Sequence, residues 1–427
     1  MSAKKSKNSE VDDLMVLYPC CAGLDVHKKT VVACIITSGE HGKVNRQVRT
    51  FATTVHLLEL ADWLAEHEVS HVAMESTGVY WRPIFNILEA TFEVILVNAQ
   101  HMKAIPGRKT DILDSQWIAT LLRHGLLKAS FIPPQPIRDL RDLVRYRKSL
   151  VYARNQEVNR LHKLLETANI KLGSVASDIL GKSGRDMLAS LREGVTDHTL
   201  LAELARGKLR GKLPDLREAL EGRVQAHHRL LLGHLLDHIA FLEQRVQTLE
   251  GEIEPYLTPY QDEIALLVSI PGISETTAAT ILGEIGADMT VFPSAKHLAS
   301  WAGVAPGNRQ SGGKRLKAHT TKGNARVRAA LAEVVWVISR TKDNYLSAQY
   351  HRLVRRIGKA KAIVAVSHSL LVIIYHLLRD HKEYSDLGST YFETLDQDRV
   401  RTRAVRQLQA LGYTVTLQTA APQEESA

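Results

Sequence analysis

Residues 20–51 read CCAGLDVHKKTVVACIITSGEHGKVNRQVRTF, and this stretch decides the fold of the first part of the chain. Three strand-forming runs, CAGLDV, TVVACIIT and KVNRQVRTF, are separated by the turn signals HKK and SGEHG. Short runs of this kind joined by turns predict consecutive antiparallel strands. We therefore expect a three-stranded antiparallel meander here.

After this meander the pattern alternates between helix and strand. The successive segments are TTVHLLELADWLAEH, HVAMES, VYWRPIFNILEA, EVILVN and DILDSQWIATLLRHG, of which the first, third and fifth have helical spacing. Three strands followed by alternating helices and strands predict an α/β domain with a mixed sheet. We assign this domain to residues 18–130, after a disordered start at 1–17.

The remainder of the chain is expected to be mainly helical. The linker FIPPQP, whose prolines cannot continue a helix, opens a helical and coiled-coil region at 131–256. Two long helices, from Ile137 to about 168 and from about 225 to 254, suggest a coiled-coil arm that is either folded on itself or shared between protomers. They flank a helical insertion at about 171–224, to which we assign no chemistry. A basic, mostly helical domain follows at 257–395, and a polar tail at 396–427.

Composition narrows the class of protein. A chain of 427 residues with 44% hydrophobic and 24% charged residues is ordinary for a soluble protein of two or three domains. The sequence has neither an apolar run long enough for a membrane span nor the apolar core of a signal peptide, so we expect a cytoplasmic protein without a membrane partner. The three cysteines lack CxxC spacing, which argues against a disulfide framework or a zinc site.

The distribution of positive charge points to nucleic acid. Between residues 296 and 361, fifteen Lys or Arg residues stand against two acids, a net charge of +13, whereas the whole chain carries +9. Such a concentration is expected of a surface that binds phosphates, because a solvated face normally mixes both signs. The expected contacts are Lys109, Arg309, Lys314, Arg315, Lys317, Lys322 and Arg326.

Four carboxylates are candidates for a metal site. Asp25 lies on the first strand, Glu75 ends the fourth, and Asp111 and Asp114 open a helix with the spacing that puts both on one face. If the first and fourth strands are neighbours, the four converge. Carboxylates that converge repel one another unless cations neutralise them, and oxygen ligands favour Mg²⁺, or Mn²⁺, over zinc. Separately, each acid has a simpler interpretation, as a helix cap or a solvated strand end.

Two motifs in the basic domain remain open on the residues alone. The segment ALLVSIPGISETTAATILGEIG is patterned like a helix-hairpin-helix, in which Gly272 and the following helix start meet a phosphate, or it is purely structural. Ser311, in GNRQSGGKRLK, is either part of a flexible turn or a nucleophile, which needs an activating base or metal. A P-loop is excluded because the GxxxxGK[ST] spacing is absent.

Three motifs in order, GLDVHKK, ESTGVYW and KTDILDSQWIATLL, carry a resemblance. They resemble the RuvC-like branch of the ribonuclease H fold, and specifically the DEDD transposases of the insertion-sequence family one-ten. The later order IPGI, WAGVAP and QSGGK is similar to the second domain of these transposases. Ser115 replaces the alanine common after the last acid, which alters no ligand.

The resemblance implies a function and partners. Ser311 would attack DNA and hold it as a phosphoserine, while Lys314 and Arg315 hold the phosphate. Donor and target DNA would be bridged by a structured guide RNA, and one protomer's acids would meet another's serine in a dimer or tetramer. The long basic helix, through Arg145, Arg147 and Arg154, would track the RNA backbone, or it is a solvated helix face.

Two alternatives remain beside the recombinase. A structure-selective endonuclease such as a junction resolvase would use metal-activated water, with Ser311 only part of a loop. A nucleic-acid-binding protein with a decayed catalytic domain is the other, although all four acids stand in their motifs.

Overall fold

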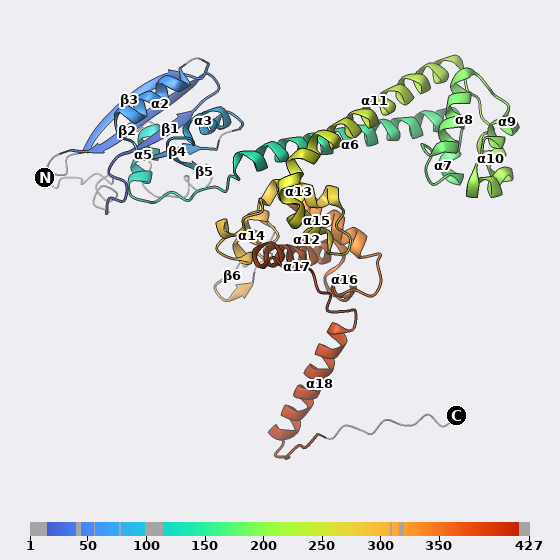
Figure 1. The fold of residues 1–427 in the computed structure, drawn as a ribbon. Coiled ribbons are helices and arrows are strands. Elements are labelled where there is room, and N and C mark those ends of the chain that lie inside the picture. Colours follow the sequence, from blue (N-terminus) through green and yellow to red (C-terminus); the bar gives the residue numbers. More distant parts are fainter. Residues whose placement is uncertain are drawn as a thin grey trace. The chain divides into compact units, whose positions relative to one another are not determined.

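The computed structural model describes residues 15–39, 44–54, 56–76, 78–98, 114–307, 310–315 and 320–417. The chain divides between Ile132 and Pro133 into two compact units, each considered by itself (Figure 1). Most of the expected disordered start and the last ten residues lie outside the described ranges.

The first unit contains one five-stranded sheet in the order β3-β2-β1-β4-β5. Its strands are β1 (Cys21–Val26), β2 (Thr30–Ser38), β3 (Val44–Ala52), β4 (His71–Glu75) and β5 (Glu93–Val97). Strands β1, β2 and β3 pair antiparallel, whereas β1, β4 and β5 pair parallel. The predicted meander and mixed sheet are confirmed.

Helices cover both faces of this sheet. They are α2 (Leu57–Glu66), α3 (Trp81–Leu88) and α5 (Asp114–Arg123). Alternate residues of β1 divide between the faces: Ala22 and Leu24 pack in the core that contains α2 and α3, and Cys21 packs in the core that contains α5. Burial in this second core raises the pKa of the Cys21 thiol to about 12, so Cys21 is an inert core residue.

Two long helices, α6 (Gln135–Thr167) and α11 (Ala226–Leu257), begin the second unit and pack against each other within one chain. Both were predicted within a few residues. Their far ends join a helical insertion consisting of α7 (Leu172–Val175), α8 (Lys182–Glu193), α9 (His198–Glu203), η2 (Gly207–Lys212) and α10 (Leu213–Ala219). Leu161, Leu232 and Ile239 of the long helices share one buried core with this insertion.

The rest of the second unit is helical except for one small hairpin. Its elements are η3 (Thr258–Tyr260), α12 (Gln261–Val268), α13 (Glu275–Ile285), η4 (Met289–Val291), α14 (Ala295–Ala302), β6 (Gln310–Ser311), β7 (Lys314–Arg315), α15 (Ala325–Ile338), α16 (Tyr345–Ile357), α17 (Lys359–Asp380) and α18 (Tyr391–Ala410). The expected start of a polar tail at residue 396 falls inside α18, so that boundary is corrected.

Helix α17 is the centre of this helical part. It contacts α12, α14, α15 and α16, and residues such as Val366, Leu370 and Ile374 are fully buried. Its length and composition alone would suit a membrane span, so the expectation that the sequence contains no apolar run of that length was wrong. The packing on four sides identifies it as the core helix of this unit.

Candidate catalytic residues and nucleic-acid surface

Two of the four candidate carboxylates lie side by side at one edge of the sheet. Strands β1 and β4 are parallel neighbours, with Leu24 opposite Met74. The next residue on each strand is Asp25 and Glu75, so both acids emerge at the carboxyl end of the same pair of strands. This is the neighbour relation on which the sequence argument depended.

Helix α5 brings a third carboxylate toward this edge. A Cβ added to Gly23 would lie 2.3 Å from the Ala119 nitrogen and 2.3 Å from the Ser115 oxygen, so the helix backbone touches β1 at the glycine. At the C-terminal end of α5, the Arg123 backbone oxygen accepts a hydrogen bond of 2.8 Å from the N–H of Leu17, which precedes β1. Helix α5 therefore runs antiparallel to β1, and its first residue, Asp114, lies toward the end of the strand that carries Asp25.

The donor set at this edge suits a hard cation. The candidate ligands described at this edge, Asp25, Glu75 and Asp114, all offer carboxylate oxygens. The Asp25 side chain is 23% exposed, and His27 Nε2 lies 3.2 Å from its Oδ2. Within the described ranges, no three acids, histidines or cysteines lie close enough together to hold a metal ion. The fourth acid, Asp111, and the neighbouring Lys109 lie outside these ranges. Oxygen ligands of this kind fit Mg²⁺ or Mn²⁺ rather than zinc.

Ser311 lies on a small hairpin rather than on an irregular loop. Strands β6 and β7 pair antiparallel, with Ser311 opposite Lys314. The two residues between them, Gly312 and Gly313, have φ values of +56° and +76°. Two positive φ angles in a two-residue connection are typical of a type I′ turn, which glycine adopts without strain. Ser311 is therefore the last strand residue before a tight turn.

Two further glycines close the base of the segment that carries this hairpin. A Cβ on Gly323 would lie 2.2 Å from the Gly303 nitrogen, and a Cβ on Gly303 would lie 2.7 Å from the Gly323 nitrogen. The Asn324 N–H also donates to the Trp301 oxygen at 3.1 Å. The chain segments that leave α14 and enter α15 therefore lie in backbone contact at Gly303 and Gly323, and a larger side chain at either glycine would push them apart. We call this contact the neck.

A buried carboxylate, Glu284 on α13, anchors this neck. Its side chain, 1% exposed, accepts two hydrogen bonds from Arg145 of α6, at 2.6 and 2.8 Å, and one from Asn324 Nδ2 at 2.7 Å. Asn324 in turn caps α15, since its Oδ1 accepts from the Arg326 and Val327 N–H groups. Glu284 therefore ties three elements together at the base of the serine segment.

The charge state of Glu284 follows from these contacts. Burial alone would raise the pKa of its carboxyl, but the hydrogen bonds from Arg145 and Asn324 outweigh it and lower the pKa below its ordinary value. The same contact raises the pKa of Arg145. Sequence reasoning missed Glu284, although a single acid within the apolar run TILGEIG is a signal of a paired buried charge.

The basic residues expected to bind nucleic acid divide into two groups. Lys314, Lys322 and Arg326 are exposed around the hairpin and the start of α15. Arg309 and Lys317 lie outside the described ranges, and the Arg315 side chain is likewise not described. The exposed members are available for phosphate oxygens.

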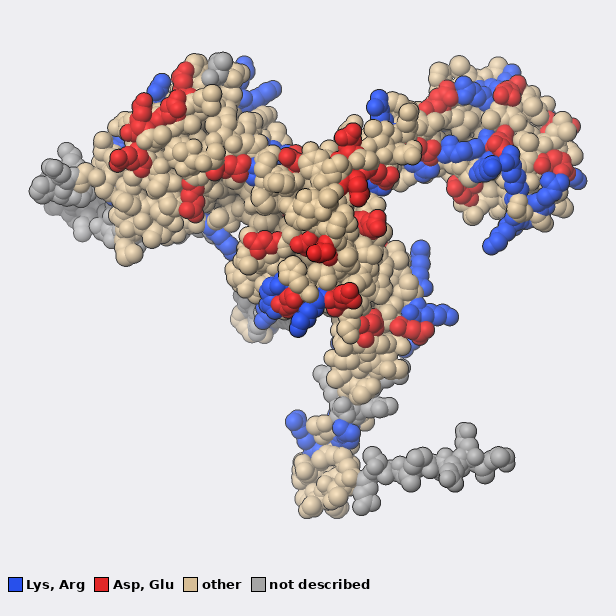
Figure 2. Space-filling model, in the orientation of Figure 1, with Lys and Arg blue, Asp and Glu red and all other residues tan. Residues whose placement is uncertain are grey.

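The arginines of the long helix have partners within the chain. Arg145 pairs with Glu284, Arg147 with Glu250, and Arg154 with Glu243 at 2.9 Å. These ion pairs connect α6 to α13 and α11, and Figure 2 shows acidic as well as basic side chains on the visible face of the insertion. The geometry thus gives these arginines a structural role, and contact with RNA stays a prediction.

Gly272 lies in a helical hairpin, as its sequence pattern indicates. It joins α12 to α13 with a φ of +87°, which favours glycine. A Cβ there would lie 3.0 Å from Ile338 Cγ1, so the turn packs close to the end of α15. Ser274, which replaces the second glycine of such motifs, caps α13 by accepting from the Thr277 N–H.

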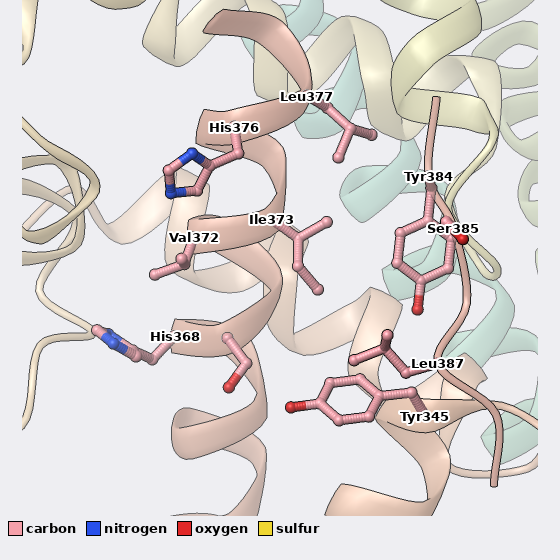
Figure 3. Close-up of a pocket in the computed structure, with 10 residues that line it drawn as sticks. Tyr345, His368, Val372, Ile373, His376, Leu377, Tyr384, Ser385 and Leu387 are labelled. Carbon is pink, nitrogen blue, oxygen red and sulfur yellow. The ribbon is translucent and has the colours of Figure 1, made fainter. Parts of the chain in front are cut away.

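A cavity of about 470 Å³ lies beside α17 in the same unit. Figure 3 shows Val372, Ile373 and His376 of the helix on one side, with Tyr384 and Leu387 opposite. Its lining is mostly apolar and contains neither Asp nor Glu. It has no carboxylate that would hold Mg²⁺ against a phosphodiester, so it is not a candidate for the proposed strand cleavage.

Two family models match the chain in the two places where the candidate residues lie. Residues 22–170 match a model of the DEDD domain of IS110, described as a transposase. Residues 264–351 match a model described as transposase, IS116/IS110/IS902 family. The first range contains all four candidate acids and the second contains Ser311.

Several curated proteins are similar over most of the chain. A pilin gene-inverting protein of Moraxella lacunata is 26% identical over 85% of this chain and 96% of its own length. A putative transposase of Sinorhizobium fredii is 26% identical over 79% of this chain and 73% of its own. An uncharacterised protein of insertion element IS900 from Mycobacterium paratuberculosis is 27% identical, covering 87% and 98%.

Proposed function

This chain belongs to the IS110 family of DNA transposases and recombinases, and we propose that it cuts and rejoins DNA through a covalent serine–DNA intermediate. The observation that carries the proposal is the pairing of β1 with β4, which puts Asp25 beside Glu75 at the edge that Asp114 approaches. We assign the first unit to the RuvC-like ribonuclease H fold, for which the strand order and the position of the acids argue.

Members of a DEDD family need a divalent cation, and we propose Mg²⁺ held by Asp25, Glu75, Asp111 and Asp114. The ion would supply positive charge where negative charge develops on the phosphate oxygens. The contribution of the chain is the rigid edge: two carboxylates on paired strands and a third on a helix fixed against Gly23.

Ser311 is the proposed nucleophile. Its Oγ forms a bond to phosphorus while the bond between that phosphorus and a deoxyribose oxygen breaks; the serine proton leaves, and the departing oxygen gains one. The phosphodiester is exchanged for a phosphoserine ester, so strands can be rejoined by the reverse step without ATP. Lys314, directly opposite Ser311 on the hairpin, is suited to hold the transferred phosphate, and we propose the same role for Arg315, whose side chain is not among those described.

Guide RNA and assembly follow from the family resemblance and stay proposals. We propose that a structured RNA selects donor and target DNA, and that a homodimer or tetramer joins the acids of one protomer to the serine of another. The exposed basic residues near the hairpin support a nucleic-acid partner without distinguishing RNA from DNA.

The test is a covalent protein–DNA adduct that survives denaturation. We expect it with the unaltered protein and Mg²⁺, and its loss in Ser311→Ala, because alanine has no hydroxyl to bond phosphorus. Thr320→Ala, an exposed hydroxyl residue of the same segment, is the matched control and should form the adduct normally. If Ser311→Ala cleaved DNA at the normal rate, the nucleophile would be water, as in a junction resolvase.

A further inference from the structure

Four exposed cations surround the turn between α16 and α17. Arg355 and Arg356 lie in the last turn of α16, Gly358 makes the turn with a φ of +78°, and Lys359 and Lys361 lie in the first turn of α17. All four side chains are exposed. We call these four residues the basic junction.

No acid lies near the basic junction in the sequence. Residues 344–379 contain no Asp or Glu. In the part of the chain that the structure describes, none of the four cations forms an ion pair, in contrast to Arg147 and Arg154 of the arm. Their positive charge is therefore left to the solvent, or to a partner.

The helix ends make this charge costly for the isolated protein. Arg355 and Arg356 are favourable at the C-terminus of α16, where carbonyl groups are exposed. Lys359 and Lys361 lie in the first turn of α17, where the helix end is itself positive. Stability alone would favour acids rather than lysines in the first turn of α17. The stability of the fold therefore does not explain Lys359 and Lys361.

We propose that the basic junction binds the sugar–phosphate backbone of duplex DNA, independently of base sequence. The commitment to a duplex comes from the absence of Phe, Tyr and Trp between residues 351 and 374, because single strands are usually held by stacking on such rings. Figure 1 draws α16 and the serine hairpin on different sides of α17. The site rests on the proposed function and deepens it by adding a second DNA contact, on other elements than the serine hairpin.

Salt dependence measures this contact directly. Each phosphate neutralised contributes about 0.9 to the slope of log affinity against log salt concentration. Replacing all four residues by alanine should lower the slope for a duplex of arbitrary sequence by about 3 to 4 and weaken binding about a hundredfold or more at low salt. The melting temperature should stay nearly the same, because the loss of two favourable arginines at the end of α16 offsets the removal of two unfavourable lysines at the start of α17.

The matched control removes the same charge elsewhere. Lys163, Lys182, Lys208 and Lys382 are exposed lysines outside the basic junction. Their fourfold replacement by alanine should leave the slope for duplex DNA nearly unchanged. An equal reduction in both variants would mean that only net charge matters, and would overturn the proposal.

The experiment also distinguishes DNA from RNA as the source of the phosphates. It further distinguishes failure of the basic-junction proposal from failure of the serine mechanism. If the slope changed for duplex RNA but not for duplex DNA, the assignment to DNA would be wrong. If binding weakened while a saturating DNA concentration still gave the Ser311 adduct, both proposals would stand. An unchanged slope with a normal Ser311-dependent adduct would reject the basic junction alone. The absence of any adduct in the unaltered protein would reject only the serine mechanism.

Discussion

At the scale of single residues, Glu284 holds together the region from which the serine hairpin extends. A fully buried carboxylate is tolerated because Arg145 and Asn324 satisfy its oxygens and Arg141 donates to its backbone oxygen at 2.7 Å. Such a pair is weak evidence for net stability, yet removal of one partner leaves an uncompensated charge. Glu284 should therefore matter more than any exposed ion pair of the arm.

Glu284→Gln is expected to lower the free energy of unfolding by about 3 kcal/mol, because Arg145 then loses its buried counter-charge. Glu250→Gln removes the partner of Arg147, where the glutamate is 47% exposed, and should cost less than about 1 kcal/mol. Urea unfolding of both variants provides the comparison. Equal losses would show that the burial of Glu284 has no energetic consequence.

The same carboxylate predicts a pH dependence. The pKa of Glu284 is lower in the folded chain than its ordinary value, so its stabilisation is fully present above about pH 4.3 and is lost as the pH falls through the lower, folded pKa. The difference in unfolding free energy between the unaltered protein and Glu284→Gln should therefore shrink as the pH falls from 7 toward 3. A difference that stayed constant over this range would contradict the ion pair.

Gly23 is the residue that lets α5 reach the sheet. Gly23→Ala would place a methyl group 2.3 Å from two backbone atoms of the helix, so the helix must move and carry Asp114 with it. We expect a loss of about 1–3 kcal/mol in stability together with loss of DNA cleavage. Gly211→Ala, where no atom lies within 4 Å, is the control and should change neither quantity. Normal cleavage by Gly23→Ala would show that the position of Asp114 is not critical.

At the scale of elements, the serine hairpin depends on its turn. Gly312 and Gly313 both have positive φ angles, which cost other residues about 1–2 kcal/mol each. Replacing them by Ala-Ala should sharply reduce the yield of serine–DNA adduct, whereas Asn-Gly, which favours the same turn, should retain it. Global thermal unfolding should be similar for both variants because the hairpin is local. An undiminished adduct with Ala-Ala would show that the turn does not position Ser311.

Sequence patterns predicted the elements better than the partners of their side chains. Both long helices were found from apolar spacing, since burial of one face imposes a helical period. Charge along the long basic helix predicts RNA contacts at Arg145, Arg147 and Arg154, whereas in the structure each pairs with an acid on another helix. Those acids are 89 to 139 residues away in sequence, so no local pattern could reveal them.

At the scale of the whole molecule, the chain consists of two compact units, with the described carboxylates in the first and Ser311 in the second. If the reacting groups meet between protomers, a mixture of Asp25→Asn and Ser311→Ala proteins should recover strand exchange, because a mixed dimer keeps one site with intact acids and an intact serine. Each variant alone should be inactive while still binding DNA. No recovery after co-expression would mean that the acids and serine of one protomer act together.

The sequence by itself determined the α/β class of the first unit, the succession of strands and helices along it and the location of the basic charge. Strand and helix periods, turns and composition are local properties, and they are readable along the chain. Only the tertiary structure decided that Asp25 neighbours Glu75, that Gly23 admits α5, and that Glu284 anchors the serine segment. Each of these depends on contact between residues distant in sequence, and such contacts are selected by packing and charge pairing in the folded state.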